Sequence, residues 1–66
     1  MVVKVNGDNK HVSPDGTLYD LISFLNLADK VMAAAVNMKV VKKTEWSRYI
    51  LKPDDKVELL DFVGGG

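Results

Sequence analysis

Only one segment of this 66-residue chain has the apolar spacing of an amphipathic helix. Its apolar side chains recur at i, i+3, i+4 and i+7, namely at Leu18, Leu21, Ile22 and Leu25. Thr17 stands where a helix N-cap is wanted, and Asp20 follows three residues later, as in a capping box. The sequence therefore predicts one main helix, whose apolar side must be buried against other elements.

The segments around this helix have the patterns of short strands, expected over residues 3–6, 10–12, 31–37, 39–41 and 56–63. A hairpin turn is expected over residues 6–9, a helix end at Asn26 and a short helical turn over residues 44–47. Residues 31–37 are apolar on both faces, as in a strand buried at the centre of a sheet. This order predicts an α+β fold, in which a mixed sheet of about five strands has one helix packed on one face.

The predicted core lies between the helix and the sheet. The apolar side of the helix is expected to face five strand residues: Val3, Val5, Val36, Val57 and Leu59. Trp46 is expected to close the open end of this core. We expect one domain over residues 1–63, followed by a flexible tail of three glycines at residues 64–66.

Composition excludes most kinds of active site. The chain has no cysteine, so it has no disulfide, thiolate metal site, redox thiol or side-chain persulfide. His11 is the single histidine, which excludes a histidine metal cluster and a conventional catalytic triad. A domain of this size buries only about 60% of its unfolded surface and has no room for a deep catalytic cleft. We therefore expect no catalytic residue, no metal site and no permanently bound cofactor.

Charge and hydropathy narrow the class of partner. The formal net charge is zero, whereas nucleic-acid binding relies on neutralising phosphates. The apolar run over residues 31–36 is far shorter than the roughly 20 residues that cross a bilayer. Residue 1 leads directly into a Val/Lys alternation that does not resemble a secretory signal. The expectation is a cytoplasmic protein that is a monomer when free and binds neither nucleic acid nor membrane.

The three glycines at residues 64–66 are the feature that the fold does not need. They can reach about 10 Å, at roughly 3.3–3.6 Å per residue. Such a thread can enter a narrow slot in a partner, where any Cβ would collide with the walls. The α-carboxylate of Gly66 is the group suited to covalent chemistry, but it is a poor electrophile and needs activation by a partner. The alternative interpretation is that the glycines are a frayed terminus without a role.

With this tail, the whole chain resembles the ThiS family of ubiquitin-like sulfur carrier proteins in thiamine biosynthesis. The resemblance rests on Val5-Asn6-Gly7, Ala35-Val36-Asn37, Glu45-Trp46, Leu51-Lys52, Lys56-Val57-Glu58 and Phe62-Val63-Gly64-Gly65-Gly66. It implies the β-grasp fold, which is that of ubiquitin. One departure is Met38, because many family members have glycine after the asparagine of this turn.

The resemblance also implies a carrier cycle. An adenylating enzyme of the ThiF type would use ATP to convert the Gly66 carboxylate to an acyl-adenylate. Sulfur from a cysteine-derived persulfide, supplied by a cysteine desulfurase route, would then replace AMP and leave a thiocarboxylate. A thiazole synthase of the ThiG type would accept that sulfur, and Gly64 and Gly65 would thread into the partners. The protein would then be a protein-borne substrate and not an enzyme.

The final strand supplies a candidate docking face. Leu60 and Phe62 alternate away from the core-facing side of this strand, so both are expected on its open face, although Phe62 could equally pack locally. They join Val63, Glu58 and Asp61 as candidate docking residues. The nearby Asp54 and Asp55 are expected to be solvated turn charges.

Two other functions stay open at this point. One is a sulfur carrier for molybdopterin synthesis, which shares the activation chemistry and differs in its partner. The other is a β-grasp interaction module whose glycines are incidental.

Overall fold

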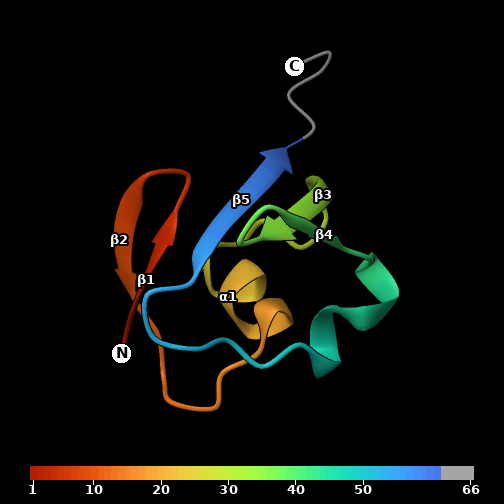
Figure 1. The fold of residues 1–66 in the computed structure, drawn as a ribbon. Coiled ribbons are helices and arrows are strands. Elements are labelled where there is room, and N and C mark those ends of the chain that lie inside the picture. The colour runs from red at the N-terminus through yellow and green to blue at the C-terminus, as the bar shows by residue number, and fades with distance from the viewer. Residues whose placement is uncertain (62–66) are drawn as a thin grey trace.

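The computed structural model describes residues 1–61, which form a five-stranded sheet, an α-helix and a 3₁₀ helix (Figure 1). The elements in chain order are β1 (Val2–Val5), β2 (Asp8–His11), α1 (Leu18–Phe24), β3 (Val31–Val36), β4 (Lys39–Val41), η1 (Lys43–Arg48) and β5 (Lys56–Asp61). The α+β arrangement predicted from the sequence is confirmed. The expected domain boundary between residues 63 and 64 lies outside the described residues.

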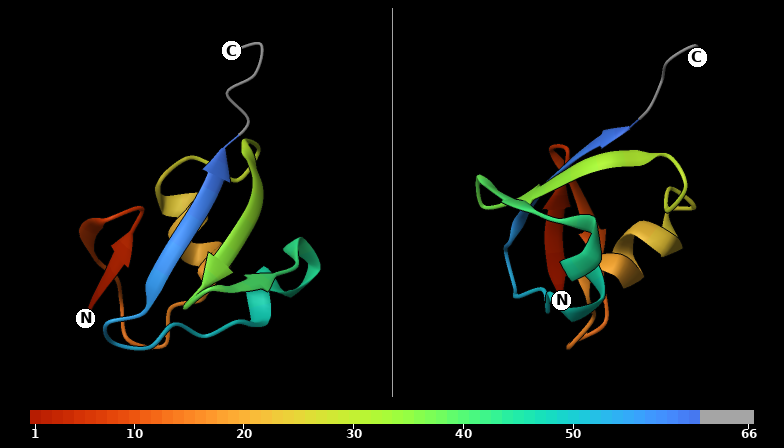
Figure 2. Two further views of the ribbon diagram at one scale, coloured as in Figure 1. Left: turned by 45° about the horizontal axis from the view of Figure 1, so that its top comes forward. Right: turned by 90° about the vertical axis from the view of Figure 1, so that its right-hand side faces the viewer.

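The last strand lies at the centre of the sheet. The strand order is β2-β1-β5-β3-β4, with β5 parallel to β1 and antiparallel to β3. Helix α1 lies against one face of this sheet, as the two views in Figure 2 show. Within residues 1–61 no helix covers the opposite face. The chain therefore leads from the middle strand of a half-covered sheet toward residues 62–66.

The first hairpin is tighter than predicted. Asn6 and Gly7 both have positive φ, at 50° and 91°, as in a type I′ turn. Two residues therefore complete the reversal, and β2 begins at Asp8 instead of residue 10. The four-residue turn expected over residues 6–9 is wrong for this reason.

The second hairpin keeps the same turn geometry without glycine. Asn37 has φ 52° and Met38 has φ 74°, so a methionine occupies a position that favours glycine. Its side chain is 82% exposed. The departure at Met38 therefore leaves the turn unchanged and places an apolar side chain at its tip.

Helix α1 starts and ends through local hydrogen bonds. The Thr17 hydroxyl accepts from the Asp20 amide at 3.0 Å, and the Asp20 carboxylate accepts from the Thr17 amide at 3.0 Å, which confirms the capping box. At the other end, Asn26 has φ 60° and the Leu27 amide donates to the Ile22 carbonyl at 3.0 Å. This is a Schellman arrangement with asparagine in the left-handed position, and it ends the helix at Phe24.

The core lies between α1 and the sheet, as predicted. Its buried apolar residues are Val3, Val5, Leu18, Leu21, Ile22, Val31, Ala34, Val36, Val41, Trp46, Leu51, Val57 and Leu59. Trp46 is 1% exposed and closes the core from η1, as expected. Leu25, the C-cap residue of α1, is only partly buried against this core. The expectation that residues 31–37 are buried on both faces is wrong, since Met32 is 62% exposed on β3.

Candidate functional site

The predicted carrier residues and two of the five predicted docking residues lie beyond the described part of the chain. Gly64, Gly65 and Gly66 lie outside it, as do Phe62 and Val63. The other candidates, Glu58, Leu60 and Asp61, belong to β5. The main chain of Asp61 pairs with Val31 of β3. Strand pairing in the sheet therefore extends to Asp61, the residue before Phe62.

Leu60 and Glu58 lie on the uncovered face of the sheet. Leu60 is 62% exposed, whereas its neighbour Leu59 is 8% exposed and belongs to the core. Glu58 is exposed in the same alternation. The orientation predicted for this strand is confirmed for the residues that the structure describes.

Strand pairing extends this face beyond the residues that the sequence singled out. Ala35 of β3 pairs with Glu58 on one side and with Val40 of β4 on the other, and Ala33 pairs with Leu60. Val40 is 75% exposed. We call Ala33, Ala35, Met38, Val40, Glu58 and Leu60 the open-face patch. These residues line a hollow of about 420 Å³, together with Ala34, Leu59 and Asn6 of the first hairpin.

The small side chains of β3 produce this hollow. Ala33 and Ala35 are half-buried and pair with larger side chains on the neighbouring strands. The Ala35 methyl group lies between Val40 and Glu58, and the Ala33 methyl group lies beside Leu60, so the small side chains leave a shallow depression between larger ones. Contiguous exposed apolar surface of this kind marks interaction sites in small domains. The open-face patch is therefore a candidate docking surface.

Asp55, one of the acidic residues near β5 that the structure describes, does not contribute to the surface. Asp55 is buried, and its carboxylate accepts hydrogen bonds from the Asn37 side chain at 2.9 Å and the Lys52 amide at 2.8 Å. The expectation that Asp55 is a solvated turn charge is therefore wrong, while Asp54 is exposed. Glu58 shares its surroundings with Lys4 and Lys56, which line a second hollow beside it. The charge around the patch is mixed.

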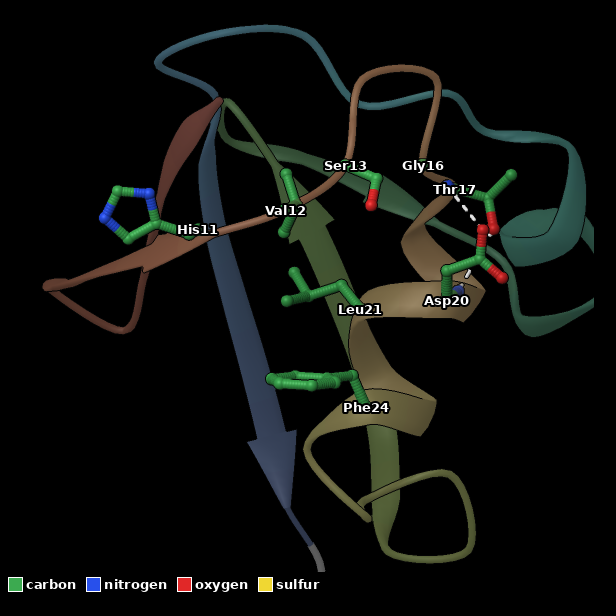
Figure 3. A pocket seen from close by; sticks show the side chains of 8 residues that line it. All are labelled: His11, Val12, Ser13, Gly16, Thr17, Asp20, Leu21 and Phe24. Carbon is green, nitrogen blue, oxygen red and sulfur yellow. Dashed lines mark hydrogen bonds between the residues drawn. The ribbon is translucent and has the colours of Figure 1, made fainter.

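A separate hollow of about 260 Å³ lies between α1 and the segment that follows β2 (Figure 3). Leu21 and Phe24 line its apolar side, and Phe24 is 78% exposed. The polar groups of Thr17 and Asp20 already bond to each other's main chain, as Figure 3 shows. The His11 ring projects away from the helix in the same view. This hollow therefore offers few unpaired polar groups to a ligand.

Other site types receive no support from the described residues. Among residues 1–61 there is no group of three or more His, Asp or Glu side chains placed to hold a metal ion. In the same part of the chain, no helix has the length and apolar character needed to cross a membrane.

Comparison with known proteins identifies the family. The family model described as the ThiS family matches residues 3–66, nearly the whole chain. The chain belongs to the ThiS family. Its similarity to the sulfur carrier protein ThiS of Bacillus subtilis is 30% identity, covering 98% of this chain and all of that one. The ThiS family resemblance inferred from the sequence is thus confirmed, and with it membership of a family of sulfur carriers in thiamine biosynthesis.

A solved ThiS structure has the same fold. The crystal structure of the thiamine biosynthesis protein ThiS from Geobacter metallireducens matches this chain with a TM-score of 0.81 and 30% identity. The match covers 100% of both chains. The predicted β-grasp fold is therefore confirmed.

Longer relatives of the ThiS family are also similar to this chain. Thiazole synthases from Paramagnetospirillum magneticum and Magnetococcus marinus match all of it, at 27% and 30% identity. The chain spans only 20% of the length of each of these proteins. In both organisms a ThiS-like region is thus part of a protein named thiazole synthase.

Proposed function

We propose that this chain carries sulfur as a thiocarboxylate on Gly66 and delivers it for thiazole formation. The observation that carries the proposal is the family match, which runs through residue 66 and so includes the glycine tail. The central position of β5 agrees with this role, because the strand held on both sides leads directly to the tail. In this proposal the chain is a substrate of its partners and not itself an enzyme.

The proposed chemistry begins with activation of the carboxylate. An adenylating enzyme of the ThiF type joins the Gly66 carboxylate to AMP from ATP and releases pyrophosphate. The terminal sulfur of a persulfide donor attacks the acyl carbon, and AMP leaves. A second thiol then cleaves the sulfur–sulfur bond, which yields the thiocarboxylate and a disulfide. The chain contains no cysteine, so its own side chains cannot compete for the sulfur.

We further propose that the open-face patch docks the adenylating enzyme. The patch includes Leu60, one residue before Asp61 and close in sequence to the tail. A partner that seats an apolar side chain in the hollow between Leu60 and Val40 would hold β5 while residues 62–66 reach its active site. Phe62 and Val63 extend this surface in the proposal, together with Asp61.

Thiazole synthase is the proposed acceptor of the sulfur. Support comes from the two thiazole synthases that contain a region similar to this whole chain. A carrier region joined to a synthase has a high effective concentration at its acceptor. We infer that this chain delivers sulfur to a ThiG-type synthase for the same transfer, and that it does so in the cytoplasm.

The adenylation step can be tested by ATP–pyrophosphate exchange with a ThiF-type enzyme. The unchanged chain should support exchange, whereas deletion of Gly66 or the change Gly65→Val should abolish it. Both changes lie outside the core, so the unfolding transition should stay as in the unchanged chain and serves as the control. Exchange that persists after deletion of Gly66 would exclude that carboxylate as the site.

A further inference from the structure

The side chain of Asn6 bonds to β5 beyond the end of β1, where, within residues 1–61, no strand residue pairs with β5 on that side. The Leu59 amide donates to Asn6 Oδ1 at 2.8 Å, and Asn6 Nδ2 donates to the Leu59 carbonyl at 3.3 Å. A carboxamide has the same donor and acceptor as a peptide group. It can therefore both accept a hydrogen bond from a strand and donate one to it, as the main chain of a neighbouring strand would.

The main chain of β1 cannot make this contact. Strands β1 and β5 pair at only two positions, where Lys4 faces Lys56 and Val5 faces Val57. The Asn6 amide donates to the Val57 carbonyl at 2.9 Å, and the positive φ of Asn6 then turns the chain toward β2. The Asn6 side chain therefore continues the hydrogen bonding on the β1 side of β5 by two residues, from Val57 to Leu59.

The pairing of β5 with its other neighbour becomes irregular just beyond this extension, since Leu59 itself still pairs in register with Ala34 of β3. The pairing of β3 with β5 shifts register between Val31 and Ala33, opposite Asp61 and Leu60. A bulge interrupts the regular ladder at such a point. On its β1 side, β5 is held at Leu59 by the Asn6 carboxamide, just before this irregularity.

We propose that Asn6 is a positioning residue for sulfur transfer, because its carboxamide fixes the direction in which β5 delivers the chain to residue 62. This inference rests on the proposed function of Gly66. Asn6 does not touch the reacting carboxylate in this proposal. It lowers the number of orientations that the end of β5 samples before the tail enters a partner.

Asn37 offers a matched comparison. Its side-chain oxygen accepts from the Lys56 amide at 3.0 Å, so it also holds β5 through a carboxamide in a hairpin turn. Like Asn6, it has positive φ, which glycine accepts without strain. It differs in holding the start of β5, the end remote from the tail.

The test compares Asn6→Gly with Asn37→Gly in the full chain. Both changes remove a carboxamide that bonds to β5 and keep the turn geometry, and Asn37→Gly also removes the donor to the buried Asp55 carboxylate. In ATP–pyrophosphate exchange, Asn6→Gly should raise KM roughly five- to tenfold and leave kcat unchanged, since the loss corresponds to about one hydrogen-bonded pair. Asn37→Gly should leave both parameters unchanged, although it also lowers stability.

Hydrogen exchange measured by NMR supplies a readout that does not depend on the enzyme. The Leu59 amide should exchange faster in Asn6→Gly and stay protected in Asn37→Gly. A direct contact between Asn6 and the enzyme would raise KM without changing this exchange, so an unchanged Leu59 amide would overturn the proposal. Equal KM values for the two variants would overturn it as well.

A conservative variant guards against failure to fold. Asn6→Asp keeps the size and the tolerance for positive φ, and retains the acceptor for the Leu59 amide while losing the donor to its carbonyl. It should raise KM less than Asn6→Gly does. Asn9→Asp, at an exposed position on β2, controls for the added charge. If the unchanged chain supports no exchange at all, the Gly66 proposal fails, and the Leu59 amide still decides whether Asn6 holds the strand.

Discussion

The indole nitrogen of Trp46 donates a 3.0 Å hydrogen bond to the carbonyl oxygen of Val41, inside the core. The bond joins η1 to the end of β4, so the largest buried side chain also satisfies a main-chain acceptor as the chain leaves the sheet. Trp46 thus closes the core and fixes the connection from the edge strand to the helical turn.

Trp46→Phe should lower the free energy of unfolding by about 2–4 kcal/mol, because it opens a cavity and leaves the Val41 carbonyl without its partner. A domain of this size has a total stability on the order of 3–10 kcal/mol. Urea unfolding followed by circular dichroism measures the change. Tyr49→Phe, on a partly buried ring packed against the same core, should change stability by less than about 0.5 kcal/mol. Similar losses for the two variants would contradict the role given to the indole nitrogen.

Met38→Gly should stabilise the domain by about 0.5–1 kcal/mol. A positive φ strains an L-residue such as Met38, whereas glycine adopts it without strain. Relief of this strain should outweigh the stability that is lost because glycine makes the unfolded chain more flexible. Gly7→Ala is the inverse experiment, since Gly7 has φ 91° and an added Cβ would meet no atom within 4 Å. It should destabilise by about 1 kcal/mol through backbone strain alone. A shift of the same sign in both variants would contradict this account of the turns.

Thr17→Ala should destabilise the domain by about 1 kcal/mol, because the Asp20 amide loses its acceptor at the start of α1. Thr17→Ser keeps the hydroxyl and should retain most of the stability. Thermal unfolding of the three proteins checks the prediction. An alanine variant as stable as the serine variant would show that the capping box contributes nothing measurable.

The open-face patch predicts a separation between stability and partner binding. Leu60→Thr combined with Val40→Thr keeps strand-forming residues at exposed positions, so the unfolding transition should move little. The KM for the carrier in ATP–pyrophosphate exchange should rise roughly tenfold or more, as expected when an apolar anchor is lost. Phe24→Gln alters an equally exposed apolar residue on α1 and should leave KM unchanged. A raised KM for Phe24→Gln together with an unchanged KM for the double variant would place docking on the helical side of the domain.

Local signals were sufficient to predict most of the elements. The apolar spacing of Leu18, Leu21 and Ile22 and the capping box at Thr17 define α1, since these interactions are close in sequence. The alternation of side chains along β5 was enough to predict that Leu59 faces the core and Leu60 faces the open side of the sheet. The stop at Asn26 followed from its tolerance of the left-handed region, which the structure shows at φ 60°.

Interactions between distant segments could not be predicted in this way. The open-face patch depends on the registers that bring Val40 beside Ala35 and Ala35 beside Glu58, and no local pattern specifies them. The buried carboxylate of Asp55 is bonded to Asn37, 18 residues away. The pairing of Asn6 with Leu59 spans 53 residues. Each of these polar side chains resembled an ordinary turn residue in the sequence.

The central claim, that sulfur is carried on Gly66, is tested most directly by mass spectrometry. The chain is incubated with ATP, a ThiF-type enzyme and a persulfide donor, and the intact protein and its carboxyl-terminal peptide are weighed. One oxygen should be replaced by sulfur in the peptide that contains Gly66, and the sulfur should be lost again when thiazole synthase and its substrates are added. An unchanged mass under these conditions, or sulfur found on any other peptide, would contradict this claim.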